Sequence, residues 1–85
     1  MAKVILYTTN PCGYCVMAKN LLKKKGVEFE ERMVFGGTSG WDEMMSLTRG
    51  RTVPQILIDG SVIGGLPDLL RLEESGELDS LLERA

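Results

Sequence analysis

Residues 3–24, KVILYTTNPCGYCVMAKNLLKK, have the clearest structural pattern in the chain. The first part, residues 3–9, is rich in β-branched and apolar side chains and has the length of a β-strand. Its apolar residues do not alternate with polar ones, which is typical of a strand covered on both faces. Asn10-Pro11 then ends the strand.

Helical periodicity follows directly. The apolar side chains after Cys12 recur at helical spacing, on a face made of Cys15, Met17, Ala18, Leu21 and Leu22. The other face carries Lys19, Asn20, Lys23 and Lys24. Gly26 suits the left-handed position that ends a helix. The stretch therefore predicts a strand, a turn that contains Cys12, and an amphipathic helix.

The chain has two cysteines and no histidine. It therefore lacks the imidazole of Ser-His-Asp and Cys-His catalysis, and two thiolates alone cannot complete a four-coordinate zinc site. A structural disulfide between Cys12 and Cys15 would restrain little of the unfolded chain, because the loop is so short. Two core cysteines that merely lie three residues apart are a second alternative. The position at a strand–helix junction favours a redox-active pair in a reducing compartment.

Cys12 and Cys15 are expected to play different roles. Cys12 lies just ahead of the predicted helix, where unpaired backbone N–H groups and the positive end of the helix dipole favour a thiolate. Cys15 lies in the first turn and is partly covered by the helix. Cys12 is thus predicted to be the exposed nucleophile and Cys15 the resolving thiol.

Later segments complete one α/β domain. Val27–Glu30 alternates apolar and charged residues and predicts a second strand, parallel to the first. A helix is expected from an N-cap at Ser39 to Gly50, with Trp41, Met44, Met45 and Thr48 on one face. A hairpin is predicted from residues 55–58 and 61–63 around Asp59-Gly60.

The last part of the chain predicts a helix that starts near Pro67, a break at Gly76 and a short final helix. Its leucines at helical spacing are Leu66, Leu69, Leu70, Leu78, Leu81 and Leu82. The expected architecture is a single domain over residues 1–85, with a four-stranded mixed sheet flanked by three or four helices.

Composition narrows the class of protein. The chain has 85 residues and a net charge of −2, which argues against nucleic-acid binding. No apolar run reaches the ~18 residues of a membrane-spanning helix, and the N-terminus lacks the apolar core of a signal peptide. We therefore expect a protein that binds neither nucleic acid nor membranes. We also expect it to be a monomer in the cytoplasm.

The motifs Cys12-Gly13-Tyr14-Cys15, Thr52-Val53-Pro54 and Gly64-Gly65 before Pro67-Asp68 occur in an order that resembles the glutaredoxins, members of the thioredoxin-fold superfamily. The resemblance implies that the peptide bond before Pro54 is cis, and that Val53 pairs its backbone with the cysteinyl part of glutathione. Gly65 and Asp68 would lie at the γ-glutamyl end. The implied glutathione-binding residues are Tyr14, Arg51, Thr52, Val53, Pro54, Gly65, Leu66 and Asp68.

The resemblance implies a glutathione-dependent thiol–disulfide oxidoreductase that reduces protein disulfides and glutathione mixed disulfides. Glutathione is then a co-substrate, and glutathione reductase acts indirectly by recycling it. No tightly bound cofactor and no metal are expected. One alternative is a [2Fe–2S] carrier, a dimer in which Cys12 and glutathione would ligate the cluster. Another is a redoxin that thioredoxin reductase reduces and that serves ribonucleotide reductase.

Three positions depart from the commoner family pattern. Thr9 stands where a Lys or Arg would meet a glutathione carboxylate, and Gly13 replaces the more usual proline between the cysteines. Pro67 lacks a backbone N–H that would help to bind the γ-glutamyl carboxylate. Arg51 is either the cation that compensates for Thr9 or a solvated loop residue.

Overall fold

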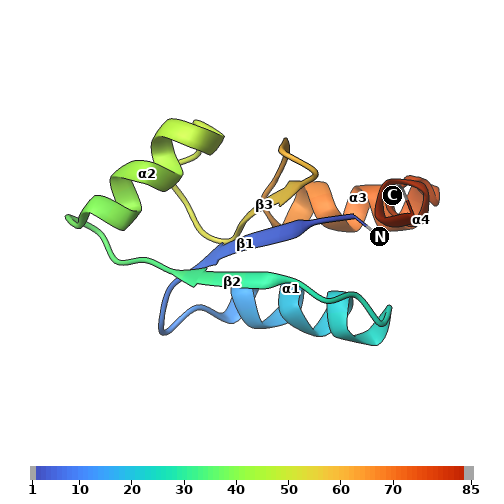
Figure 1. The fold of residues 1–85 in the computed structure, drawn as a ribbon. Coiled ribbons are helices and arrows are strands. Elements are labelled where there is room, and N and C mark those ends of the chain that lie inside the picture. Colours follow the sequence, from blue (N-terminus) through green and yellow to red (C-terminus); the bar gives the residue numbers. More distant parts are fainter. Residues whose placement is uncertain (1, 84–85) are drawn as a thin grey trace.

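A computed structural model describes residues 2–83 of the chain, which form a mixed sheet with helices around it (Figure 1). The elements in chain order are β1 (Val4–Thr8), α1 (Gly13–Lys24), β2 (Glu30–Met33), α2 (Ser39–Thr48), β3 (Gln55–Ile58), β4 (Ser61–Gly64), α3 (Leu66–Ser75) and α4 (Glu77–Glu83). The sheet order is β2-β1-β3-β4, with β1 parallel to β2 and antiparallel to β3, and β3 antiparallel to β4. The predicted mixed four-stranded sheet is confirmed.

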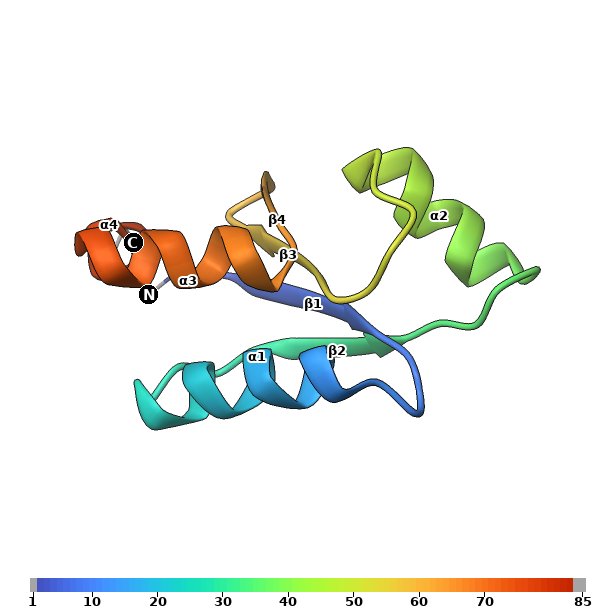
Figure 2. The same cartoon turned by 180° about the vertical axis from the view of Figure 1, so that it is seen from behind.

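Strand β1 is buried on both faces, as its uninterrupted apolar pattern predicts. Val4 and Leu6 belong to a core cluster with α1, α3 and α4, whereas Tyr7 belongs to a second cluster that contains Met44 of α2. Figures 1 and 2 show α2 apart from the other helices, near the ends of β1 and β2. The two clusters therefore place α1 and α2 against opposite sides of β1.

The second strand starts later than the sequence predicts. Residues 27–29 lie outside β2, and its register begins at Ile5 opposite Glu30. The reason is the end of α1: Gly26 has φ +72°, and the N–H of Val27 donates to the carbonyl of Leu22 at 3.0 Å. Because this N–H closes the helix, Val27 is not free to join the sheet.

Both ends of α2 differ from the predicted caps by one residue. Thr38, not Ser39, is the N-cap, since its Oγ1 accepts a hydrogen bond from the N–H of Trp41 at 3.3 Å. Arg49 takes the left-handed C-terminal position, with φ 60°. Gly50 is needed for a different reason, because a Cβ there would collide with the side-chain amide of Gln55.

The hairpin and the C-terminal helices agree with the sequence prediction. Asp59 and Gly60 both have positive φ, as a two-residue type I′ turn requires, and Gly76 (φ +83°) separates α3 from α4. Two apolar residues are more exposed than their helical positions suggest, namely Met17 at 51% and Leu70 at 44%. Among residues 2–83, no helix has the length and hydropathy needed to cross a membrane.

Candidate active site

The two cysteines occupy the start of α1 and form a disulfide, with their Cα atoms 5.2 Å apart. Cys12 is the N-cap residue, and its Sγ accepts a hydrogen bond from the N–H of Cys15 at 3.1 Å. Cys12 is partly exposed, whereas Cys15 is 1% exposed. The difference in burial is the one that the sequence predicts for an attacking and a resolving thiol.

The electrostatic environment of Cys12 is set by the backbone of α1. The first turn of the helix contains no acidic side chain that would oppose a thiolate. When the disulfide opens, the N–H of Cys15 and the positive end of the helix dipole face the Cys12 sulfur. Within residues 2–83, no three His, Cys, Asp or Glu side chains gather in an arrangement that could hold a metal ion.

Segment 49–54 lies beside the cysteines and forms one side of the site, which we call the Val53 wall. The Val53–Pro54 peptide is cis, as the family resemblance implies, and the carbonyl oxygen of Val53 lies 4.0 Å from Cys12 Sγ. The side-chain amide of the buried Gln55 donates to the carbonyl oxygen of Thr52 at 2.9 Å. This bond holds the segment in place beside the disulfide.

A groove of about 330 Å³ lies next to this wall. Its lining residues come from α1, segment 49–54 and the start of α3, and are Tyr14, Thr52, Val53, Pro54, Gly65, Leu66 and Pro67. Six residues that the sequence assigns to glutathione binding therefore meet at one place. Pro67, noted in the sequence only as a departure from the family pattern, joins them. Tyr14 is 65% exposed, so its ring forms an open side of the groove.

Two of the assigned residues do not line this groove. Arg51 is exposed on segment 49–54. Asp68 caps α3: its Oδ2 accepts a hydrogen bond from the N–H of Gly65 at 3.0 Å, and its Oδ1 is paired with Arg71. Asp68 thus fixes the backbone at the edge of the groove.

The sequence does not predict a polar contact near the site that joins Thr8, Lys19 and Glu31. The hydroxyl of Thr8, 0% exposed, donates to Glu31 Oε2 at 2.7 Å, and Lys19 Nζ of α1 lies 3.0 Å from the same oxygen. The pKa of Glu31 is lowered, first by the bond from Thr8 and then by that from Lys19. Strand alternation could have placed Glu31 on the α1 face, but the strand predicted from the sequence ends at Glu30, whereas β2 continues to Met33.

Glu31→Gln is expected to destabilise the protein by about 1 kcal/mol at neutral pH and to change little at low pH. A carboxylate with a lowered pKa contributes stability above its unfolded-state pKa of about 4.3, and this contribution is lost as the pH falls through the lower folded-state value. Urea unfolding between pH 3 and 7 measures the difference. Glu28→Gln is the control, because Glu28 makes no side-chain hydrogen bond or ion pair with the described residues. Equal pH profiles for the two variants would contradict the prediction.

The comparisons with known proteins agree with this geometry. The family model described as Glutaredoxin matches residues 4–63. Glutaredoxin 3 of Escherichia coli (strain K12) is 46% identical over 83 residues, which are 98% of this chain and 100% of that protein. The solution structure of a glutaredoxin from Brucella melitensis has a TM-score of 0.85 at 43% identity, and the match covers 98% of this chain and 90% of that one.

A more distant structural neighbour carries a ligand. The crystal structure of a buckwheat glutaredoxin–glutathione complex has a TM-score of 0.85 at 25% identity, and the match covers 95% of this chain and 76% of that one. The structural neighbours have the thioredoxin fold, as the sequence resemblance implies. Cys12, Cys15 and Pro54 lie inside the span of the family model. Gly65 and Asp68 lie beyond it, in the region that the whole-chain relative also covers.

Proposed function

Because this chain belongs to the glutaredoxin family of thiol–disulfide oxidoreductases, we propose that it uses glutathione to reduce protein disulfides and glutathione mixed disulfides. One observation carries this proposal: the partly exposed Cys12 lies beside a groove that the motif residues Tyr14, Val53 and Gly65 line together. The glutathione complex of the buckwheat neighbour adds support.

The reaction begins with the reduced enzyme. The Cys12 thiolate attacks the glutathione sulfur of a mixed disulfide, a new S–S bond forms, and the protein thiolate leaves and takes up a proton. A second glutathione thiolate then attacks the enzyme-bound glutathione sulfur, which releases oxidised glutathione and the Cys12 thiolate. The N–H of Cys15 stabilises that thiolate, so Cys12 is also a good leaving group.

Protein disulfides follow the dithiol route. Cys12 attacks one sulfur of the substrate, and the Cys15 thiolate then attacks Cys12 Sγ to form the disulfide present in this structure. The substrate leaves with both thiols reduced. Two molecules of glutathione reopen the enzyme disulfide, and glutathione reductase recycles the product with NADPH.

Different residues in and around the groove would contact different parts of glutathione. The backbone of Val53 would pair with the cysteinyl part, and the side chains of Tyr14 and Pro54 would contact it. Asp68, at the edge of the groove, would accept from the ammonium group while it keeps its bond to Gly65. Arg51 would attract a carboxylate in place of the cation that Thr9 does not supply. We propose that the protein acts as a monomer in the cytoplasm, a reducing compartment in which a glutathione cycle can run.

A coupled assay tests the electron donor. We expect NADPH oxidation with glutathione and glutathione reductase when a glutathione mixed disulfide is the substrate. The same assay with thioredoxin reductase and no glutathione is the comparison. Turnover in the second arrangement alone would contradict the proposed donor and favour the redoxin that serves ribonucleotide reductase.

A further inference from the structure

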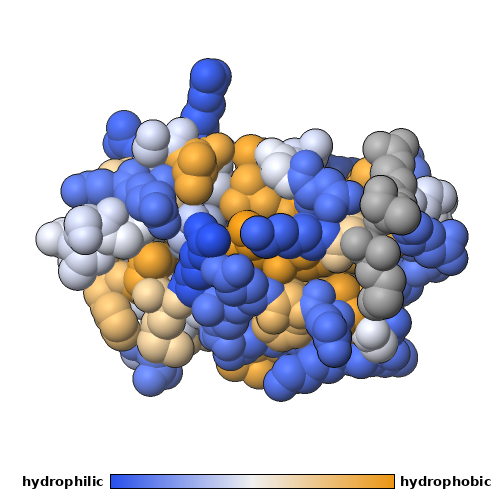
Figure 3. Space-filling model, in the orientation of Figure 1, coloured by the Kyte–Doolittle hydropathy of each residue, from blue (hydrophilic) through white to orange (hydrophobic). Residues whose placement is uncertain are grey.

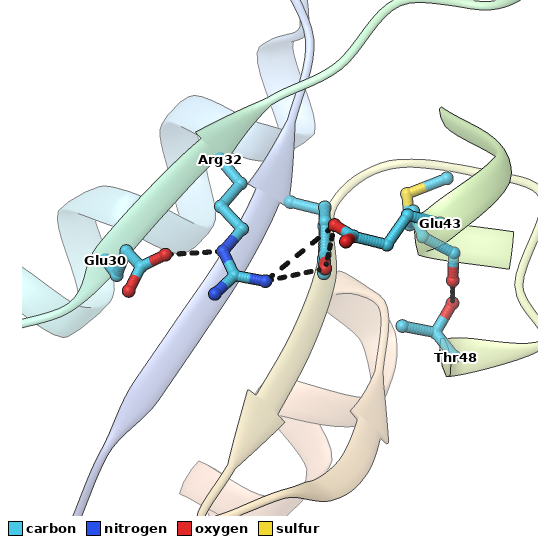
Figure 4. Close-up of polar contacts among 6 residues, drawn as sticks. Glu30, Arg32, Glu43 and Thr48 are labelled. Atoms are coloured by element: carbon cyan, nitrogen blue, oxygen red, sulfur yellow. Dashed lines mark hydrogen bonds and ion pairs between the residues drawn. The ribbon is translucent and has the colours of Figure 1, made fainter. Parts of the chain in front are cut away.

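A polar cluster joins three elements on the α2 side of the sheet (Figure 4), and we call it the Tyr7 cluster. It consists of Tyr7 of β1, Arg32 of β2 and Glu43 of α2. The hydroxyl of Tyr7 donates to Glu43 Oε2 at 3.2 Å and accepts from Arg32 Nη1 at 3.0 Å. Arg32 Nη1 also lies 3.9 Å from Glu43 Oε2. Each side chain of the cluster therefore contacts the other two.

The burial of Tyr7 and the charge of Arg32 favour these contacts over contacts with water. Tyr7 is 0% exposed, so its hydroxyl depends on these partners and not on bulk water. The Arg32 guanidinium carbon lies 5.7 Å from the centre of the Tyr7 ring. The pKa of Arg32 is raised, first by its bond to Glu30 and then by its bond to Tyr7, so Arg32 keeps its positive charge beside the Glu43 carboxylate. On the face drawn in Figure 3, hydrophilic residues lie among hydrophobic ones across the middle of the molecule.

Helix α2 depends on this cluster for its polar attachment to the sheet. Its apolar contacts come from the cluster of Tyr7, Val34, Met44 and Leu57. Among the residues that the structure describes, Glu43 is the only α2 residue whose side chain makes a hydrogen bond or ion pair with a strand. The hydrogen bond from Tyr7 to Glu43 is directional, and the Arg32–Glu43 ion pair at 3.9 Å adds attraction, so the Glu43 carboxylate favours one position of the helix on the sheet.

The position of α2 is linked to the active site through a short segment. Residues 49–54 follow α2 directly and end in Val53 and Pro54, and the side chain of Val53 packs against the same apolar cluster as Met44. The carbonyl oxygen of Val53 lies 4.0 Å from Cys12 Sγ, and Val53 lines the groove. The N–H of Gly50 donates to Thr48 Oγ1 at 3.1 Å, and this hydrogen bond restrains the start of the segment relative to α2. A displaced α2 would therefore displace the Val53 wall.

We propose that Tyr7 and Glu43 are positioning residues: the Tyr7 cluster holds α2 in register with the sheet and thereby sets the Val53 wall of the groove relative to Cys12. The expected change in KM rests on the proposed use of glutathione. The expected role of the cluster in holding α2 does not. Neither side chain contacts the reacting sulfur atoms. The cluster consequently affects the binding of the glutathione part of the substrate and leaves the chemistry of Cys12 unchanged.

Kinetics of Tyr7→Phe and Glu43→Ala give the first test. Tyr7→Phe keeps the ring in the core and removes only the hydroxyl. We expect the KM for a glutathione mixed disulfide to rise about three- to ten-fold in each variant, the effect of losing about one net hydrogen bond. We expect kcat and the thiolate titration of reduced Cys12 to stay within about two-fold of the parent. Glu43→Gln keeps an acceptor for Tyr7 and should have a smaller effect, and Glu74→Gln, on the exposed side of α3, is the matched control.

Hydrogen exchange of the oxidised protein gives a second test that needs no glutathione. In Tyr7→Phe and Glu43→Ala, we expect faster amide exchange in residues 42–54 and unchanged exchange in α1. Unchanged exchange in 49–54, or a loss of kcat with no change in KM, would overturn the positioning role. If the parent protein itself fails to turn over with glutathione, the proposed function is wrong, and the exchange comparison still decides the role of the cluster.

Discussion

Cys12→Ser is expected to abolish thiol–disulfide exchange, with a loss of at least about 10³-fold in kcat/KM, whereas Cys15→Ser is expected to keep the reduction of glutathione mixed disulfides. A serine hydroxyl at position 12 is not ionised at neutral pH and cannot form the mixed disulfide. Cys15 is 1% exposed and cannot replace it as the nucleophile. The glutathione route needs one enzyme thiol, but the dithiol route needs both.

Two substrates separate these routes. A small glutathione mixed disulfide reports the one-thiol route, and a protein disulfide reports the dithiol route. Cys15→Ser should lose most of the second activity and little of the first. Cys12→Ser/Cys15→Ser gives the background rate. Equal loss of the mixed-disulfide activity in both single variants would show that the two cysteines share the attacking role, contrary to their difference in burial.

Gly64→Ala is expected to destabilise the protein by about 2–4 kcal/mol, because it combines backbone strain with the loss of a hydrogen bond. Gly64 has φ +114°, where an L side chain is strained, and a Cβ there would lie 2.9 Å from Cγ of Asp68. The Asp68 carboxylate would have to leave the N–H of Gly65, from which it accepts at 3.0 Å. The change therefore adds the loss of a helix cap, about 1 kcal/mol, to the strain of the backbone.

Gly76→Ala is the matched control for this prediction. Gly76 also has a positive φ, +83°, but a Cβ at that position meets no atom within 4 Å. It should cost only about 1–2 kcal/mol for the left-handed conformation. Urea unfolding of the oxidised variants measures both values, and equal slopes with denaturant would show that the same unfolding is compared. If Gly64→Ala cost no more than Gly76→Ala, the contact with Asp68 would be unimportant for stability.

Local signals in the sequence predict the elements and the redox pair. These signals are the apolar run before Cys12, the helical spacing after it and the Asp59-Gly60 turn. Each depends only on residues a few positions apart, so each can be recognised from the sequence alone. The errors are local as well. The alternation of Val27 with charged residues predicts a strand, but the N–H of Val27 serves the end of α1. Glycine is typical of a helix end, so the sequence predicts that α2 ends at Gly50. In the structure, a glycine at this position instead leaves room for the side chain of Gln55.

Local signals along the chain predict the order of strands and helices and the unequal burial of Cys12 and Cys15, because periodicity, turn residues and a helix N-terminus depend on neighbours along the chain. Long-range packing sets which groups meet. It brings Tyr14, Val53 and Gly65 from three distant segments into one groove and joins Tyr7 to Glu43 across 36 positions of the chain. Such contacts follow from strand register and helix packing, and a shift of one residue in a strand would turn Tyr7 to the opposite face of the sheet.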